Sequence, residues 1–388
     1  MNMKLNLSVK NIIQYVAVAL FIVCSGSCIG IVCARYFDLI FVFTTFVLCL
    51  YTTRKFSQKN LAVLFLFLLI YISSYLVNIK FTPNINAYFS YFIRLTGTFF
   101  LLSALTQQEF EEKYVNTLHI VNLFGLLAYA LVINTEVRSY LTYVESFPLL
   151  GPFNFVKLHE ERNSGIFWEP GAYQLFILYA LTIIFRKSDW QILQLKNKFK
   201  VAVCILSLLS TKSTTGYLLL AGFAIFFLVK NWSSLPKISK ILTVLPVLML
   251  IGGCIYFVMG SSVVQSKFIS SNMSYAIRLN DLVSSFDLLI QEYPILGLGY
   301  ESSMLKQINA SRSIGNNSVG LTAEALSIGI IYVISFIYIM FKNVKRAYFQ
   351  EYLLLWSILA VMFFAEDFFM YPIFFMWLFR PRKKKNLA

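Results

Sequence analysis

The stretch Leu61-Ala-Val-Leu-Phe-Leu-Phe-Leu-Leu-Ile-Tyr-Ile-Ser-Ser-Tyr-Leu-Val-Asn-Ile79 contains 19 residues and no charged side chain. A bilayer core about 30 Å thick takes about 20 residues of α-helix, so this stretch predicts a membrane-spanning helix. Similar apolar runs recur along the 388 residues, of which 58% are apolar and 13% charged. A soluble domain of this size does not bury so much apolar side chain. We therefore predict an all-α integral membrane protein with one polytopic domain, residues 1–388.

Apolar runs between charged flanks predict about twelve transmembrane helices, or ten to eleven if the short ones do not cross the bilayer. The first run follows Lys4 and Lys10 and lacks a clear small-residue cleavage site, so we expect it to be retained as a helix. The predicted spans are residues 12–33, 37–53, 61–79, 88–105, 117–134, 168–185, 200–211, 214–230, 241–260, 318–341, 351–365 and 368–379.

The distribution of Lys and Arg predicts the orientation of these spans. With both termini in the cytoplasm, the inner segments hold 22 of the 33 cationic residues, as expected because basic loops stay inside. The net charge of +15 is then a topology signal, and no nucleic-acid partner is needed to explain it. The basic tail from Arg380 to Lys385 is expected to contact anionic membrane lipids. Two long segments, 135–167 and 261–317, fall outside the membrane and are where function is expected.

The first outer segment ends in several residues that can carry chemistry. Arg162 suits a diphosphate, which a guanidinium grips with two hydrogen bonds, or it forms an interfacial ion pair with the carboxylates before it. Glu169 before Pro170 suits the start of a helix, and it is equally a candidate catalytic carboxylate. His159, taken alone, is more often structural than catalytic.

The second outer segment and the spans contain further candidates. The sequence Gly297-Leu-Gly299 has no strand or Walker lysine around it, so a tight turn is the simpler interpretation. Glu324 lies inside an apolar helix, where a carboxylate usually faces a polar cavity. The same argument marks Arg94 and, more weakly, Lys212. Arg278 and Arg312 are further cations of this segment.

Nothing in the sequence predicts a metal site or a cofactor. The six cysteines lie in apolar runs without metal-ligand spacing, and we interpret them as small core residues. Clusters of His, Asp and Glu with such spacing are also missing from the sequence, so arginines are expected to take the place of a divalent ion.

Four motifs together resemble the O-antigen ligase and Wzy polymerase superfamily. Arg162-Asn-Ser-Gly-Ile-Phe-Trp-Glu-Pro-Gly171 resembles its Arg-x-x-Gly-x-Phe-x-(Glu/Asp)-Pro signature, and Leu208-Leu-Ser-Thr-Lys-Ser-Thr-Thr-Gly216 is similar to its Thr-x-Ser-x-x-Gly hairpin. Tyr293-Pro-Ile-Leu-Gly-Leu-Gly299 resembles its Pro-x-x-Gly-x-Gly element, and the segment from Asn316 to Gly329 resembles its His-Asn helix start. The motifs follow the family's order, and the resemblance covers about residues 90–345.

The resemblance implies a glycosyltransferase in the bacterial inner membrane. Its substrates would be undecaprenyl-diphosphate-linked glycan repeats, joined at the periplasmic face, with a chain-length regulator and a flippase as partners. Ligases of the superfamily carry a His where this chain has Asn316, and an amide cannot accept the proton of a hydroxyl. This disfavours a ligase and moves the role of general base to Glu324 or Glu169.

The expected binding residues are the cations that can hold a diphosphate and the polar residues beside them. They are Arg162, Arg278, Arg312, Arg94, His159, Asn316 and Asn317. The aromatic rings of Phe167, Trp168, Tyr173 and Tyr300 are candidates for stacking on sugars.

Two classes of protein compete with the polymerase hypothesis. A flippase or other transporter for lipid-linked oligosaccharides also has about twelve spans and buried charges, but usually shows two similar halves with broken helices at matching positions. We find no such symmetry in the sequence. A scaffold without enzymatic activity is disfavoured by Glu324 and by the arginines of the outer segments.

Overall fold

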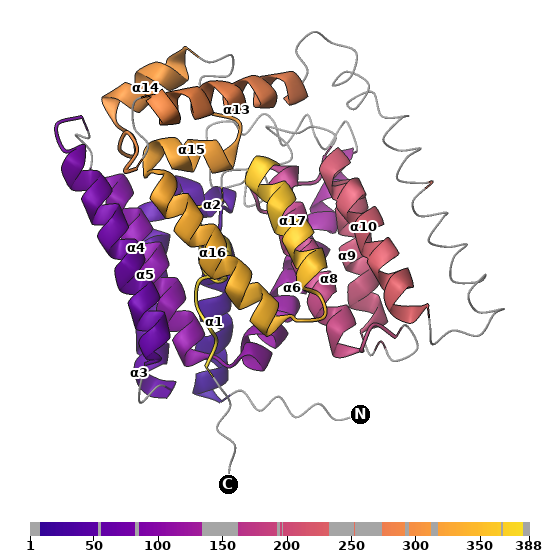
Figure 1. Cartoon of the computed structure of the whole chain (residues 1–388). Coiled ribbons are helices and arrows are strands. Elements are labelled where there is room, and N and C mark those ends of the chain that lie inside the picture. The colour runs from indigo at the N-terminus through magenta and orange to yellow at the C-terminus, as the bar shows by residue number, and fades with distance from the viewer. Residues whose placement is uncertain are drawn as a thin grey trace. The chain divides into compact units, whose positions relative to one another are not determined.

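The computed structural model describes residues 8–52, 56–81, 85–133, 162–191, 195, 197–232, 252, 274–291, 295–311, 317–365 and 368–382. These residues form α-helices joined by turns, and no β-strand occurs among them (Figure 1). The predicted span 241–260 lies almost entirely outside the described residues, as do residues 135–161, 261–273, 292–294 and 312–316 of the two outer segments. The described part of the chain therefore confirms the all-α class.

The chain divides into two compact units. Unit 1 comprises Met1–Thr117, Asn280–Ala347 and Asp367–Ala388, and unit 2 comprises Leu118–Leu279 and Tyr348–Glu366. Two helices contribute to both units, namely α6 (Gln107–Ile133) and α13 (Ser274–Gln291).

Unit 1 contains long apolar helices and a group of shorter ones. In Figure 1, α3, α4 and α5 run side by side, and α14 and α15 lie across one end of α4 and α16. The helices of this unit are α1 (Val9–Cys24), α2 (Cys28–Val32), α3 (Ala34–Thr52), α4 (Gln58–Val77), α5 (Asn86–Ala104), α14 (Ser303–Ala310), α15 (Gly320–Ser327), α16 (Ile330–Ala347) and α18 (Pro372–Phe375).

Unit 2 is built around α8 (Pro170–Lys187), which is buried along nearly its whole length. Residues 170–185 are all buried, so this helix faces protein on every side. Its neighbours are α9 (Lys198–Ser210), α10 (Thr214–Asn231) and α17 (Tyr352–Ala365).

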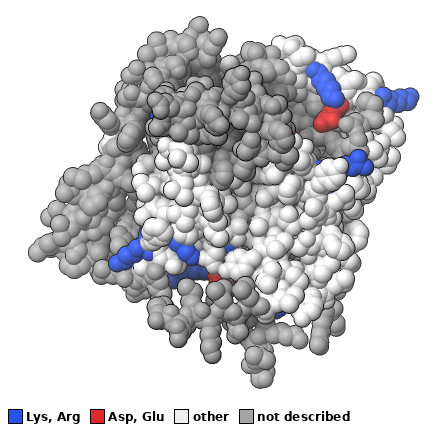
Figure 2. All heavy atoms as spheres, turned by 180° about the vertical axis from the view of Figure 1, so that it is seen from behind, with Lys and Arg blue, Asp and Glu red and all other residues white. Residues whose placement is uncertain are grey.

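Four described helices are long and apolar enough to cross a membrane. They are α3, α4, Gln107–Leu131 of α6, and α10. Large apolar side chains point outward from them, including Phe43 and Leu50 on α3 and Phe65 and Leu69 on α4. On the face shown in Figure 2, most described atoms belong to uncharged residues, and the few Lys, Arg, Asp and Glu side chains lie near the margins. Such a surface suits lipid and not water, and the chain is a helical membrane protein.

Two predicted spans are broken by turns. The predicted helix 12–33 ends at Cys24 and resumes as α2, with Gly26 at φ 99° between them. Ser27 then caps α2, since its hydroxyl accepts a hydrogen bond from the Gly30 amide at 3.0 Å. The prediction of one helix over 318–341 is also wrong, because α15 ends at Ser327 and α16 begins at Ile330.

The predicted span 368–379 is wrong as well. Its only helix is α18, whose four residues begin at Pro372, and turns follow from Met376. Four residues rise about 6 Å, far less than a bilayer. Most of this segment is buried within unit 1, and the Ile373 amide donates to the Ser25 hydroxyl at the break between α1 and α2.

The break between α15 and α16 is closed by the Gly297-Leu-Gly299 turn. The Leu298 amide donates to the Leu326 carbonyl at 2.7 Å, and the Gly299 amide donates to the Ser327 carbonyl at 2.9 Å. These bonds satisfy carbonyls at the end of α15 that have no partner within the helix. Gly297 and Gly299 have φ of 67° and 88°, which confirms the predicted turn.

We expect Gly329→Ala to destabilise the protein strongly. Gly329 has φ 114°, and a Cβ there would overlap the Ile295 carbonyl. Left-handed backbone alone costs an L-residue about 1–2 kcal/mol, and the overlap adds to that. Gly222→Ala in α10 is the control, because a Cβ there meets nothing within 4 Å and alanine favours helix. The thermal midpoint in detergent should fall for the first variant alone, and equal midpoints would contradict the tight contact.

Candidate functional site

The first two motifs meet in unit 2. The Asn163 amide nitrogen donates to the Ser210 carbonyl at 3.0 Å, and its side-chain Nδ2 donates to Ser210 Oγ at 2.9 Å. Asn163 is fully buried, and its Oδ1 accepts a hydrogen bond from the Gly165 amide at 2.8 Å. These bonds tie the segment before α8 to the turn between α9 and α10, although 47 residues separate the two partners.

Arg162 lies at the carboxyl end of α9. Its Nε donates to the Thr211 carbonyl at 3.1 Å, where the helix dipole is negative and a cation is favoured. The next residue, Lys212, adopts φ 45°, an uncommon conformation for a residue with a Cβ. Arg162, which is half-buried, thus contacts the turn that contains Lys212, 50 positions later in the sequence.

Glu169 and Pro170 begin α8 as predicted. Glu169 occupies the N-cap position, but its carboxylate makes no capping hydrogen bond. The side chain is half-buried. Because the capping bond is missing, its oxygens do not hold the first turn of the helix. The interpretation of Glu169 as the start of a helix therefore explains its position in the chain but assigns no role to its carboxylate.

The aromatic residues around this start differ in exposure. Phe167 and Tyr173 are fully buried, and the Tyr173 hydroxyl donates to Asn122 Oδ1 at 2.7 Å. These two rings form part of the core, which corrects the expectation that they stack on sugars. Trp168 and Tyr300 are half-buried and remain candidates for that role.

The third and fourth motifs meet in unit 1. The turn around Gly297 and Gly299 closes the end of α15, and the start of α15 is held by α13. Asp281, buried on α13, accepts hydrogen bonds from the Ser318 amide at 2.9 Å and the Ser318 hydroxyl at 2.6 Å. Sequence analysis gives Asp281 no role, and only the fold reveals this one.

Asn317 stabilises the same start of the helix from inside. Its Oδ1 accepts the Val319 amide at 3.0 Å, and its Nδ2 donates to Ser285 Oγ and Thr322 Oγ1, both at 3.1 Å. Asn317 was predicted to bind substrate, and here it orders the turn that precedes α15.

Glu324 lies on α15 and is 1% exposed. Its carboxylate is near enough to interact electrostatically with the phenols of Tyr71, Tyr88, Tyr91 and Tyr332. The Tyr91 hydroxyl donates to the Tyr332 hydroxyl at 2.9 Å, and the Tyr71 and Tyr91 rings stack at 3.7 Å. These phenol groups come from α4, α5 and α16, which no spacing in the sequence connects.

Arg94 forms a buried ion pair with Asp38. Its Nε lies 2.8 Å from Asp38 Oδ1 and 3.0 Å from Oδ2, and the two side chains are 9% and 1% exposed. The guanidinium also lies 5.0 Å from the centre of the Tyr371 ring. Sequence analysis missed Asp38, which stands at the start of a predicted span. Arg94 therefore has a structural role as the partner of Asp38, and its role in diphosphate binding stays a prediction.

The remaining predicted residues are distributed unevenly. Arg278 is half-buried on α13, whereas His159, Arg312 and Asn316 lie outside the described residues. Glu169 belongs to unit 2 and Glu324 to unit 1. Within the described ranges, no group of three His, Cys, Asp or Glu side chains could hold a metal ion.

Comparison of the chain with models of known protein families and with curated proteins finds no match to either.

We expect Arg94→Met to destabilise the protein by about 3–5 kcal/mol, because it leaves Asp38 buried without its counter-charge. Combining Arg94→Met with Asp38→Leu should restore much of the loss. Arg35→Met, on an exposed residue of α3, should change stability by less than about 0.5 kcal/mol. Thermal unfolding of the three purified variants measures these effects. A double variant no more stable than Arg94→Met would argue against the ion pair.

Proposed function

We propose that this chain is a Wzy-type polymerase of O-antigen or a related surface polysaccharide in the bacterial inner membrane. One observation carries the proposal: the four motifs of the resemblance, spread over 168 residues from Arg162 to Gly329, form two pairs held by hydrogen bonds. Segments that only resembled the family by chance would have no reason to meet in this way.

The proposed reaction joins two undecaprenyl-diphosphate-linked repeats at the periplasmic face. The acceptor hydroxyl gives its proton to a carboxylate and attacks the anomeric carbon of the donor glycan. The bond between that carbon and the diphosphate oxygen breaks, and undecaprenyl diphosphate leaves. Arg162 and Arg278, with Arg312, would stabilise the negative charge on the leaving group.

Glu324 is the proposed general base, with Glu169 as the alternative. A carboxylate withdrawn from water and near several phenol groups is a candidate base for a sugar hydroxyl. Phenol hydroxyls near it, including that of Tyr71, can also bind the polar groups of a glycan. Glu169 is supported by its unengaged carboxylate and by the cations Arg162 and Lys212 in its own unit.

The proposal includes the predicted orientation, with both termini in the cytoplasm. This topology places Lys212 outside and Lys345 inside. We expect a membrane-impermeant maleimide to label Lys212→Cys in intact spheroplasts, and to label Lys345→Cys only after the membrane is opened. Both variants are made in a chain whose six native cysteines are replaced, which serves as the unlabelled control. Labelling of the two positions from the same side would contradict the topology.

A transporter of lipid-linked oligosaccharides is the second candidate, and the broken helices favour it. Breaks after α1 and after α15 resemble the discontinuous helices of transporters. Both breaks lie in unit 1, however, whereas transporters built from repeats carry them at corresponding positions of two halves. The polymerase therefore remains the better-supported function.

The decisive assay supplies the purified protein with synthetic undecaprenyl-diphosphate repeats. Wild type should extend the glycan into a ladder, also with a chelator present. General bases contribute about 10²–10⁴-fold in rate, so Glu324→Gln should lower the rate at least about 100-fold. Arg162→Ala should also lower it, because the leaving diphosphate loses a hydrogen-bonded cation.

Two comparisons make this assay specific. Glu112→Gln removes a carboxylate that is exposed on α6, and it should leave the rate unchanged. Glu169→Gln identifies the base: a loss larger than that of Glu324→Gln would transfer the role to Glu169. Repeats that stay unjoined but cross the bilayer of a proteoliposome would instead establish the transporter.

A further inference from the structure

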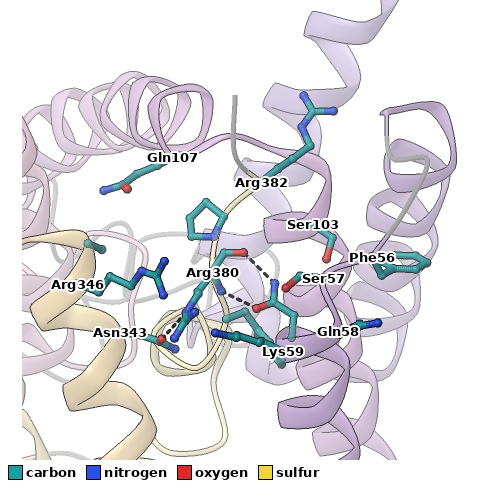
Figure 3. A pocket seen from close by; sticks show the side chains of 14 residues that line it. Phe56, Ser57, Gln58, Lys59, Ser103, Gln107, Asn343, Arg346, Arg380 and Arg382 are labelled. Carbon is teal, nitrogen blue, oxygen red and sulfur yellow. Dashed lines mark hydrogen bonds between the residues drawn. The ribbon is translucent and has the colours of Figure 1, made fainter. Parts of the chain in front are cut away.

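A cavity of about 680 Å³ lies within unit 1, away from Glu324 and from the four motifs. It is lined by the start of α4, the ends of α5 and α16, and the segment that follows Leu378. Four of its lining residues are cations, namely Lys59, Arg346, Arg380 and Arg382 (Figure 3). The predicted topology places all four on the cytoplasmic side.

Two buried asparagines hold the wall that carries Arg380. Asn60 Nδ2 donates to the Arg380 carbonyl at 2.8 Å, and the Arg380 amide donates to Asn60 Oδ1 at 3.1 Å. Asn343 Nδ2 donates to the carbonyls of Trp377 and Leu378, and its Oδ1 accepts Arg380 Nε at 3.0 Å. Arg380 is therefore oriented through its backbone and its Nε, so that Nη1 and Nη2 are left to bind a ligand.

The positive charge of the cavity exceeds its negative charge. Among the described residues, none that lines the cavity is acidic. Two carboxylates contact its lining from outside: Glu111 Oε1 accepts a hydrogen bond from Gln107 Nε2 at 3.0 Å, and Glu109 Oε2 lies 3.6 Å from Arg382 Nη2. Burial, and then the neighbouring charge of Arg346, lower the pKa of the Arg380 guanidinium below its ordinary value. Like charges held together in a sheltered hollow are stabilised by an anion.

We propose that this cavity binds the phosphate group of an anionic ligand, with Arg346 and Arg380 as its principal contacts. Two arginines can hold a phosphate through several charge-assisted hydrogen bonds, and Lys59 adds a third charge. An anionic phospholipid supplies such a phosphate at the inner leaflet. Its acyl chains would lie along α4, which begins beside the cavity and exposes Phe65 and Leu69 further along. A soluble phosphate is the other source of the same chemistry.

The test measures the thermal midpoint of the full-length protein in a neutral detergent. Short-chain phosphatidylglycerol, short-chain phosphatidylcholine and inorganic phosphate are titrated at constant ionic strength. Phosphatidylglycerol should raise the midpoint saturably. Arg346→Gln should weaken its apparent affinity about tenfold, as expected for losing a hydrogen bond to a charged group. Lys342→Gln, one turn earlier on α16 and also exposed, removes the same charge outside the cavity and should have no effect.

The outcomes separate the sources and the alternatives. A shift by phosphatidylglycerol that depends on Arg346 supports a lipid headgroup, whereas an equal shift by inorganic phosphate supports a soluble ligand in the same site. No saturable shift with either, or equal weakening by Arg346→Gln and Lys342→Gln, would overturn the proposal. Because none of these residues has a role in the proposed glycosyl transfer, polymerase activity and phosphate binding can fail independently.

Discussion

The joint between α15 and α16 is the constraint on which the described part of unit 1 depends. A helix that ends inside an apolar environment leaves carbonyls that lipid cannot satisfy. Here the amides of Leu298 and Gly299 meet the carbonyls of Leu326 and Ser327, and Gly297 and Gly329 let two backbones approach more closely than side chains would allow. The break permits α15 to stop after eight residues and to hold Glu324 at a buried depth among phenols.

The second half of this arrangement is the start of α15. Asp281 and Asn317 fasten it by hydrogen bonds, so α15 is secured at both ends by segments distant from it in the sequence. A buried carboxylate needs such support, because an ill-positioned charge would draw in water. The pairing of segments 162–171 and 208–216 in unit 2 follows the same logic, with Asn163 in the role of the buried connector.

Sequence patterns predicted the helical class well because span length is a property of single segments. The run 61–79 corresponds to α4, and Glu169 with Pro170 gave the start of α8 correctly. The run 318–341 failed because the break at Gly329 depends on the turn around Gly297, which lies 32 positions earlier. Likewise, Arg94 was recognised as costly in a span, but its partner Asp38 was not, since the pairing depends on how α3 and α5 pack. Contacts of this kind are decided by the fold and leave no periodic signal.

The Arg94–Asp38 pair has a consequence for how the protein is made. During synthesis, α3 leaves the ribosome before α5, so the carboxylate is in place when the guanidinium arrives. An arginine at the centre of a lone helix raises the cost of membrane insertion by about 2.5–3.5 kcal/mol. If α5 enters the lipid beside α3, the two charges neutralise each other on arrival. Insertion of α5 into the membrane would then depend on α3, which is inserted earlier. The order in which the helices are synthesised would thus be part of the folding mechanism.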